Sequence, residues 1–83
     1  MNSNNVIDIH GETGDSIVAI INEFIEDNYK LRETIVYIIH GKGEGILRKK
    51  THELLHDNIL VESYKLDNWN LGITIINLKR LDK

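Results

Sequence analysis

The 83-residue sequence contains no cysteine, which excludes disulfide bonds, cysteine nucleophiles and thiolate metal sites. It also lacks a long apolar run and a basic leader followed by an apolar segment, so we expect neither a membrane span nor a signal peptide. A cytoplasmic location is the default expectation. A strong basic excess is missing too, because the formal net charge is −3. That balance argues against an extended basic clamp for nucleic acid.

The residues that are present have the composition of one small folded domain. Hydrophobic residues make up 41% of the chain and charged residues 28%, as is ordinary for a globular protein. We expect a loose polar tail over residues 1–5 and a single domain over residues 6–83. Residues 40–50 carry four basic side chains and one acidic one. Such a local basic patch can bind phosphate, with strong salt sensitivity.

Hydrophobic periodicity predicts the order strand, helix, strand, helix, strand, strand. We expect the strands at residues 6–9, 35–39, 61–66 and 73–78. The nearly continuous apolar run 35–39 is typical of a central strand that is buried on both faces. The first helix should follow Thr13 as N-cap, and the second helix should follow the glycine-rich segment. Apolar residues at helical spacing mark the first helix at Ile17, Ile20, Ile21, Phe24, Ile25 and Leu31, and the second at Ile46, Leu47, Thr51, Leu54 and Leu55.

Two strand–helix units followed by a hairpin predict an α/β fold with a mixed sheet and both helices on one face. A right-handed crossover places the first two strands side by side, so their carboxyl ends share one edge of the sheet. We therefore expect Asp8 and His10, at the end of the first strand, to meet residues 40–45, which follow the second strand. Two segments thirty residues apart would then form one site.

The second of these segments reads His40-Gly41-Lys42-Gly43-Glu44-Gly45. Glycine at alternate positions permits positive φ angles and lets the backbone approach a ligand closely. The helix that follows offers unpaired N–H groups and the positive end of its dipole, as a phosphate-binding turn requires. The phosphate of a polynucleotide backbone is the ligand that we expect. The candidate phosphate-binding residues are Gly41, Lys42, Gly43, Gly45, Arg48 and Lys49.

This segment resembles the HGxGxG signature of Smr (small MutS-related) domains, and Ile7-Asp8-Ile9-His10-Gly11 resembles the LDxHG-type strand end of the same family. The resemblance extends over residues 6–79, with both motifs in the family's order and spacing. It implies a two-layer sandwich of order β-α-β-α-β-β, with a four-stranded mixed sheet whose last strand is antiparallel to the rest and inserted centrally. It also implies an activity that nicks DNA or cleaves RNA.

Phosphodiester hydrolysis needs proton transfer and stabilisation of charge on the phosphate. Asp8, His10 and His40 are the candidate catalytic residues, and the resemblance implies these three together with Lys42. Imidazole titrates near neutral pH, and Asp8 could orient a histidine or hold a divalent cation such as Mg²⁺ or Mn²⁺. The alternative interpretation is structural, because Asp8 could simply face solvent and His10 could simply end a strand.

Three further features carry alternatives. Glu44 stands where the family commonly has a small hydroxyl residue, and its carboxylate would repel a phosphate.

Trp69, in the turn between the last two strands, could stack on a base, but we favour a role in covering the edge of the core. The sequence from His52 to His56 matches the HExxH motif of zinc proteases, yet no third ligand follows it, so we interpret both histidines as surface residues.

Three functions remain open at the level of sequence. The first is a nicking endonuclease that acts on DNA or RNA, linked to recombination and repair or to ribosome rescue through a parent protein. The second is a binding module for DNA or RNA without catalysis. The third is a protein-interaction domain of a larger MutS-like ATPase. The phosphate-binding turn favours the first two.

Overall fold

The computed structural model describes residues 4–81, so residues 1–3 of the predicted tail lie outside the described part. Its elements are β1 (Val6–Asp8), α1 (Ser16–Lys30), β2 (Ile35–Ile39), α2 (Ile46–Asp57), β3 (Val61–Leu66) and β4 (Ile73–Leu78). This is the predicted order, and the bounds of β2, β3 and β4 agree with the prediction. β1 is one residue shorter, although the Ile9 N–H still donates to the Ile39 carbonyl at 2.8 Å. Asn5 accepts a hydrogen bond from the Tyr37 N–H at 2.8 Å, at the end of the predicted tail.

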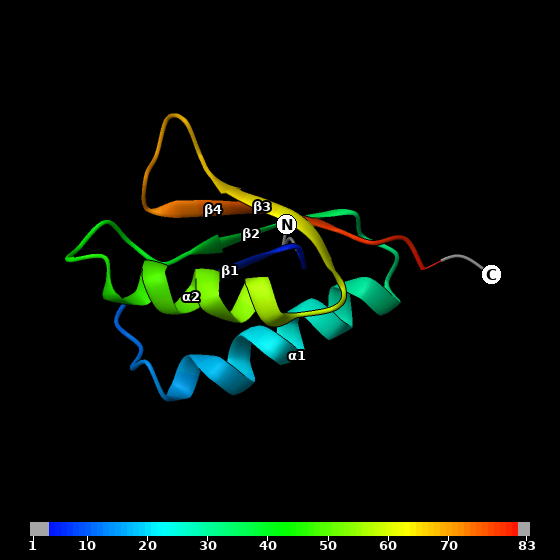
Figure 1. Cartoon of the computed structure of the whole chain (residues 1–83), viewed down its shortest axis with the longest axis horizontal. Helices are drawn as coiled ribbons and strands as arrows, with labels where there is room; N and C mark the ends of the chain where they lie inside the picture. Colours follow the sequence, from blue (N-terminus) through cyan, green and yellow to red (C-terminus); the bar gives the residue numbers. More distant parts are fainter. Residues whose placement is uncertain (1–3, 82–83) are drawn as a thin grey trace.

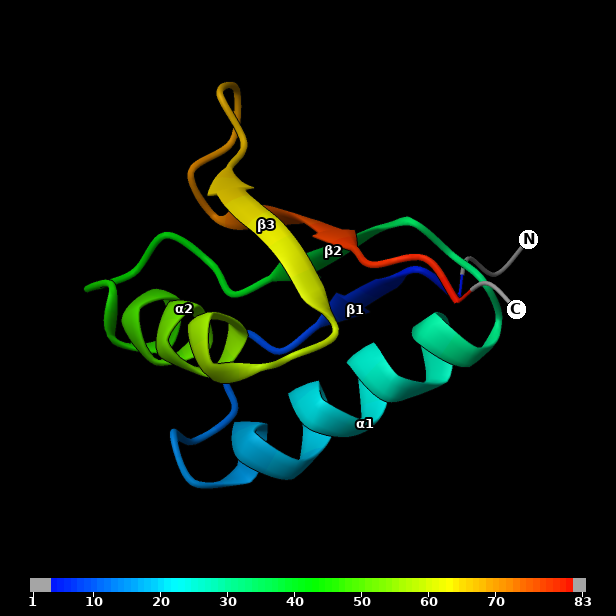
Figure 2. The same ribbon diagram turned by 45° about the vertical axis from the view of Figure 1, so that its right-hand side comes forward.

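The four strands form one sheet of order β1-β2-β4-β3. β1 and β2 are parallel, while β4 is antiparallel to both of its neighbours. The predicted mixed sheet with a central, antiparallel last strand is therefore confirmed. Both helices cover the same face of this sheet (Figure 1), and the turned view keeps them in one layer (Figure 2). Within residues 4–81, neither helix combines the length and apolar character that crossing a membrane requires.

The core lies between the helical layer and the sheet, and isoleucine dominates it. α1 contributes four buried apolar side chains at helical spacing, and the inward positions of the sheet and α2 contribute the others: Ile17, Ile21, Phe24 and Ile25, then Ile9, Val36, Ile38, Leu55, Ile76 and Leu78. Leu31, which was predicted to mark the first helix, is 57% exposed and lies just outside that helix. The reason is that α1 ends at Lys30, and Leu31 is its C-terminal cap.

The start of α1 differs slightly from the prediction. The helix begins at Ser16 with Asp15 as N-cap, rather than directly after Thr13. Thr13 still has a capping function, because its hydroxyl accepts a hydrogen bond from the Ser16 N–H at 3.1 Å. Ser16 returns the interaction, since its hydroxyl oxygen accepts from the Thr13 N–H at 3.1 Å. This reciprocal pair satisfies the N–H group of Ser16, which has no helical partner in the first turn, and that of Thr13 just before the helix.

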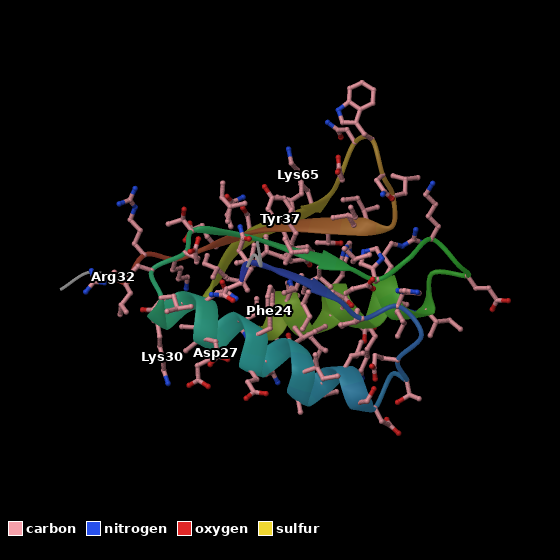
Figure 3. The ribbon with its side chains drawn as sticks, turned by 180° about the vertical axis from the view of Figure 1, so that it is seen from behind. Phe24, Asp27, Lys30, Arg32, Tyr37 and Lys65 are labelled. Carbon is pink, nitrogen blue, oxygen red and sulfur yellow. The ribbon has the colours of Figure 1, made fainter. Side chains whose placement is uncertain are left out.

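In the described part of the chain, no helix covers the outer face of the sheet (Figure 1 and Figure 2). Val36 and Ile38 of β2 point to the helices and are fully buried, but Tyr37 and Ile39 are only half-buried and Ile35 is 42% exposed. The prediction that β2 is buried on both faces was therefore wrong, because both helices cover the same side. Figure 3 shows Tyr37 and Lys65 on the open side, opposite Phe24.

Candidate functional site

The two motifs meet at the carboxyl ends of β1 and β2. Asp8 pairs with Ile39 across the parallel strands, which places His10 beside the glycine segment. The contact is close: a Cβ atom added to Gly41 would lie 3.4 Å from the Cβ atom of His10. An open hollow of about 430 Å³ lies here, lined by His10, Gly11 and residues 40–48. Figure 1 shows the corresponding loops, which follow β1 and β2, at the same end of the molecule.

Asp8 and His10 form an exposed pair on the rim of this hollow. The Oδ1 atom of Asp8 lies 2.6 Å from the Nδ1 atom of His10 and also accepts the backbone N–H of His10 at 3.0 Å. The side chains are 50% and 69% exposed, respectively. The hydrogen bond from the imidazole lowers the pKa of Asp8, and the same bond raises the pKa of His10. Asp8 therefore orients the ring and holds the proton on Nδ1, as the carboxylate of a catalytic triad does.

The glycine segment turns through two left-handed residues. Gly41 has φ +84° and Gly45 has φ +83°, a conformation that carries a steric penalty for residues with a Cβ atom. Gly43 has no positive φ, so two of the three alternate glycines adopt the left-handed conformation. Gly45 is the N-cap of α2 and provides no side-chain cap. The first N–H groups of α2 therefore have no side-chain partner at the cap and can bind an anion.

The predicted phosphate-binding residues divide between two places. Gly41, Lys42, Gly43, Gly45 and Arg48 all line the hollow between the motifs, together with Glu44. A Cβ atom on Gly45 would lie 2.7 Å from a guanidinium nitrogen of Arg48, so the cation lies directly over the helix start. Lys49 does not line this hollow. It faces the neighbouring hollow along α2, of about 690 Å³, which Tyr64 of β3 also lines.

His40 lies at the same end of the sheet but is buried, with only 4% of its surface exposed. Its Nδ1 atom is 3.0 Å from the Gly41 carbonyl, and its Nε2 atom is 2.8 Å from the Thr74 hydroxyl. Burial lowers the pKa of His40, since the cation would lose hydration there. Both ring nitrogens are thus engaged within the protein. This is the geometry of a residue that holds the turn in place.

Two residues that sequence reasoning did not select complete this end of the sheet. The carbonyl of Gly72 accepts the N–H groups of both His40 and Gly41, at 2.9 and 3.0 Å. A Cβ atom on Gly72 would lie 3.1 Å from the carbonyl carbon of Gly41, so glycine permits this close approach. Thr74, fully buried in β4, bonds the ring of His40. A signal for Thr74 was present, because it is the one hydroxyl residue among the inward positions 74, 76 and 78 of β4, where the other two residues are apolar.

The HExxH segment on α2 does not form a zinc site. The Nε2 atom of His52 is 2.7 Å from the Thr74 hydroxyl, and its ring packs against Tyr64 with centroids 5.1 Å apart. His52 is therefore half-buried and bonded, which corrects its interpretation as a surface residue, whereas His56 is exposed as expected. Across residues 4–81, no three histidine, aspartate or glutamate side chains gather as metal ligands require.

The same geometry bears on a divalent cation at Asp8. One of its two carboxylate oxygens already accepts two hydrogen bonds from His10. Mg²⁺ and Mn²⁺ prefer several oxygen ligands in octahedral arrangement. A single carboxylate paired with a histidine does not supply such a set, so the residues that the structure describes around Asp8 do not build a cation site.

Trp69 is 95% exposed in the turn between β3 and β4. The expectation that it covers the edge of the core was therefore wrong. The turn is held instead by side-chain hydrogen bonds, with Asp67 accepting the Trp69 N–H at 3.0 Å and Asn70 accepting the Gly72 N–H at 2.9 Å. Because Gly72 contacts Gly41, this exposed indole belongs to the same end of the sheet as the glycine turn.

The chain belongs to the Smr domain family, whose model matches residues 7–79. Among curated proteins, it is 34% identical over 76 residues to the endonuclease MutS2 of Agathobacter rectalis and 33% identical over 76 residues to that of Caldicellulosiruptor saccharolyticus. Each alignment covers 88% of this chain but only 10% of the relative, so the chain spans about a tenth of their length.

Solved structures agree with this assignment. The Smr domain of Thermus thermophilus MutS2 superposes with a TM-score of 0.86 at 26% identity, covering 90% of this chain and 98% of that domain. YdaL, a stand-alone small MutS-related protein from Escherichia coli, gives a TM-score of 0.89 at 18% identity, covering 95% of this chain and 67% of YdaL. At that identity the second match shows the fold alone.

Proposed function

We propose that this domain binds the phosphate backbone of DNA or RNA between residues 8–11 and 40–48 and nicks a phosphodiester bond there. The observation that carries this proposal is the exposed Asp8–His10 pair, which lies against a glycine turn and an uncapped helix N-terminus. Such an arrangement combines proton transfer with stabilisation of negative charge, the two requirements of phosphodiester hydrolysis.

We assign the proton transfer to His10 rather than to His40. The Nδ1–H of His10 donates to Asp8, which leaves Nε2 as the nitrogen that exchanges a proton with the substrate or water. The raised pKa keeps His10 protonated to a higher pH than an ordinary histidine. It therefore suits a general acid that protonates the leaving oxygen. His40 has no unengaged ring nitrogen for this purpose.

Phosphate binding falls to the start of α2. The first N–H groups of the helix, the guanidinium of Arg48 and the exposed ammonium of Lys42 provide the positive potential. The carboxylate of Glu44 opposes it on the same rim, so we expect weak, salt-sensitive binding. The exposed indole of Trp69 could add contact to an unpaired base.

The relatives support the catalytic part of the proposal, since the two curated proteins compared above are named as endonuclease MutS2. Because the chain matches only a tenth of each, we also propose that a parent MutS-like ATPase supplies the context, in recombination and repair or in ribosome rescue. A second candidate function is binding of nucleic acid without cleavage. It is favoured by the observation that both ring nitrogens of His40 are engaged within the protein, which leaves one of the two motif histidines without a nitrogen for proton transfer.

The decisive experiment compares the wild-type domain with His10→Ala and His56→Ala. Supercoiled plasmid and a folded RNA are incubated with Mg²⁺, Mn²⁺ or EDTA, and binding to fluorescent oligonucleotides is followed by anisotropy. His56 is the matched control, because it is an exposed histidine outside the hollow between the motifs. We expect His10→Ala to slow cleavage by about 100-fold or more, the usual effect of losing a proton-transfer group. His56→Ala should cleave like the wild type.

The remaining outcomes divide the alternatives. Binding that Lys42→Ala weakens, without cleavage by the wild type under any condition, would support the binding module. Cleavage that survives in His10→Ala would overturn the assignment of His10. Absence of both binding and cleavage would overturn the proposed function and leave a protein-interaction domain as the remaining interpretation.

A further inference from the structure

A single buried hydroxyl connects two histidines. Thr74 of β4 has no exposed surface, and its oxygen lies 2.8 Å from Nε2 of His40 and 2.7 Å from Nε2 of His52. The two rings approach edge to face, with centroids 6.0 Å apart. A threonine hydroxyl has one proton and two lone pairs, so it donates to one ring and accepts from the other. One of the two Nε2 atoms must therefore carry a proton, and the other must be bare.

The backbone determines the direction of these hydrogen bonds. The Gly41 carbonyl, 3.0 Å from Nδ1 of His40, can only accept, so that nitrogen carries the proton. In neutral His40 the Nε2 atom is then bare and accepts the proton of Thr74. Thr74 in turn accepts the Nε2–H of His52. The bonds run in one direction, from His52 through Thr74 and His40 to the carbonyl of Gly41.

Protonation of His40 would break this arrangement. A cationic His40 donates from both nitrogens, so Thr74 would then have to donate its proton to His52, whose Nε2 atom would have to be bare. As long as His52 keeps its Nε2–H, Thr74 would receive two donors and its own proton would have no partner at a site without solvent. Burial already disfavours the cation of His40. Burial also lowers the pKa of His52, and electrostatic interactions with His40 and Arg48 lower it further. The other charged or titratable groups along this flank are Glu44, Lys49, Glu53, His56, Asp57 and Tyr64.

We propose that His52 and Thr74 are positioning residues for the glycine turn: they hold His40 as the neutral Nδ1–H tautomer, and His40 holds the carbonyl of Gly41. This inference rests on the proposed function for its purpose, because Gly41 lines the hollow in which we place the phosphate. It extends the site further along α2, to His52, and to Thr74 of β4. It also gives the half-buried His52 a function other than metal binding.

The test is the tautomeric state of each histidine, measured by long-range ¹H–¹⁵N correlation on the labelled domain near neutral pH without nucleic acid. We expect His40 as the Nδ1–H form and His52 as the Nε2–H form. His40 protonated on Nε2, in either a neutral or a cationic ring, would overturn the inference. The wild type alone decides this point, so the result does not depend on whether any variant folds.

Variants then test the connection between the residues. Thr74→Val removes the hydroxyl and should release His52 into a mixture of tautomers, whereas Thr74→Ser should restore the wild-type pattern. His52→Ala should let His40 titrate at a higher pH, with His56→Ala as the unchanged control one turn further along α2. An unaltered His40 in His52→Ala, or an unaltered His52 in Thr74→Val, would contradict the proposal.

Binding measurements separate this inference from the proposed function. If both hold, Thr74→Val should bind oligonucleotides about fivefold more weakly, the usual effect of one net hydrogen bond, and Thr74→Ser should bind as the wild type does. Expected tautomers in a protein that binds no nucleic acid would overturn the proposed function and leave the positioning chain supported. Binding at full strength by a protein with the opposite tautomers would overturn the positioning chain and leave the proposed binding function supported.

Discussion

The histidines of the two motifs follow neighbouring parallel strands, yet their surroundings are opposite. The side chain of His10 is 69% exposed, and Asp8 raises its pKa, whereas His40 is 4% exposed and burial lowers its pKa. The position of their strands explains the difference. β1 is an edge strand, so its carboxyl end faces solvent, while β2 lies between β1 and β4. The start of β4 brings Gly72 and Thr74 onto His40.

This difference indicates that the two histidines are suited to different roles. An exposed, carboxylate-bound imidazole can exchange protons with a substrate, and a buried one with both nitrogens engaged can only hold its surroundings in place. A motif that contains histidine thus predicts a location more reliably than a role. We therefore propose that the same residue type serves chemistry at one strand end and architecture at the next.

The largest expected effect is on stability when His40 is removed. His40→Ala deletes two side-chain hydrogen bonds and leaves a cavity beside buried Thr74, so we expect a loss of about 2–3 kcal/mol in the free energy of unfolding. His10→Ala should leave the urea midpoint unchanged, because the side chain is largely exposed. Urea denaturation of both variants measures the contrast. Equal destabilisation by the two would contradict the division into an exposed and a buried histidine.

An intermediate effect is expected within the glycine turn, where Gly41 and Gly43 form a matched pair. Gly41→Ala places a Cβ atom at φ +84° and close to His10, and the left-handed conformation alone should cost about 1–2 kcal/mol. Gly43 has no positive φ and open space around it, so Gly43→Ala should be nearly neutral. Thermal unfolding of the two variants distinguishes them. A Gly43→Ala domain as unstable as Gly41→Ala would show that both positions need glycine.

The smallest expected effect is the pH dependence of stability. His40 and His52 have folded pKa values below the ordinary histidine value of 6.5, so their contribution is fully present above that value and is lost as the pH falls below it. His10 has a raised pKa and the opposite sign: its contribution is present below 6.5 and is lost as the pH rises through the raised value.

The buried pair should dominate the measurement, because the Asp8–His10 interaction is exposed to solvent screening. Tm measured between about pH 8 and about pH 5.5, a range in which ordinary carboxylates stay ionised, should therefore decrease on acidification. His52→Ala should flatten the curve, while His56→Ala should not. A Tm that rises on acidification would show that the exposed pair outweighs the buried one.

Much of the fold could be predicted from local pattern. The runs 35–39, 61–66 and 73–78 became strands with the expected bounds, because β-branched and aromatic residues between turn signals favour a pleated surface. The hollow between the motifs also follows, since two parallel strands joined by a right-handed crossover must present their carboxyl ends together. Two of the misjudged residues, Leu31 and Trp69, lie just past an element or in a turn, where periodicity carries no information about burial.

The sequence by itself determined the order of the elements, the inward faces of α1 and β4, and the turn that needs glycine. These depend on the spacing of residues along the chain and on backbone sterics, which are local properties. Only the tertiary structure decided that His10 is exposed, that His40 is engaged on both nitrogens, and that His52 and Thr74 join it. Burial and hydrogen-bond direction depend on which distant strand packs alongside, and no spacing within the chain encodes that.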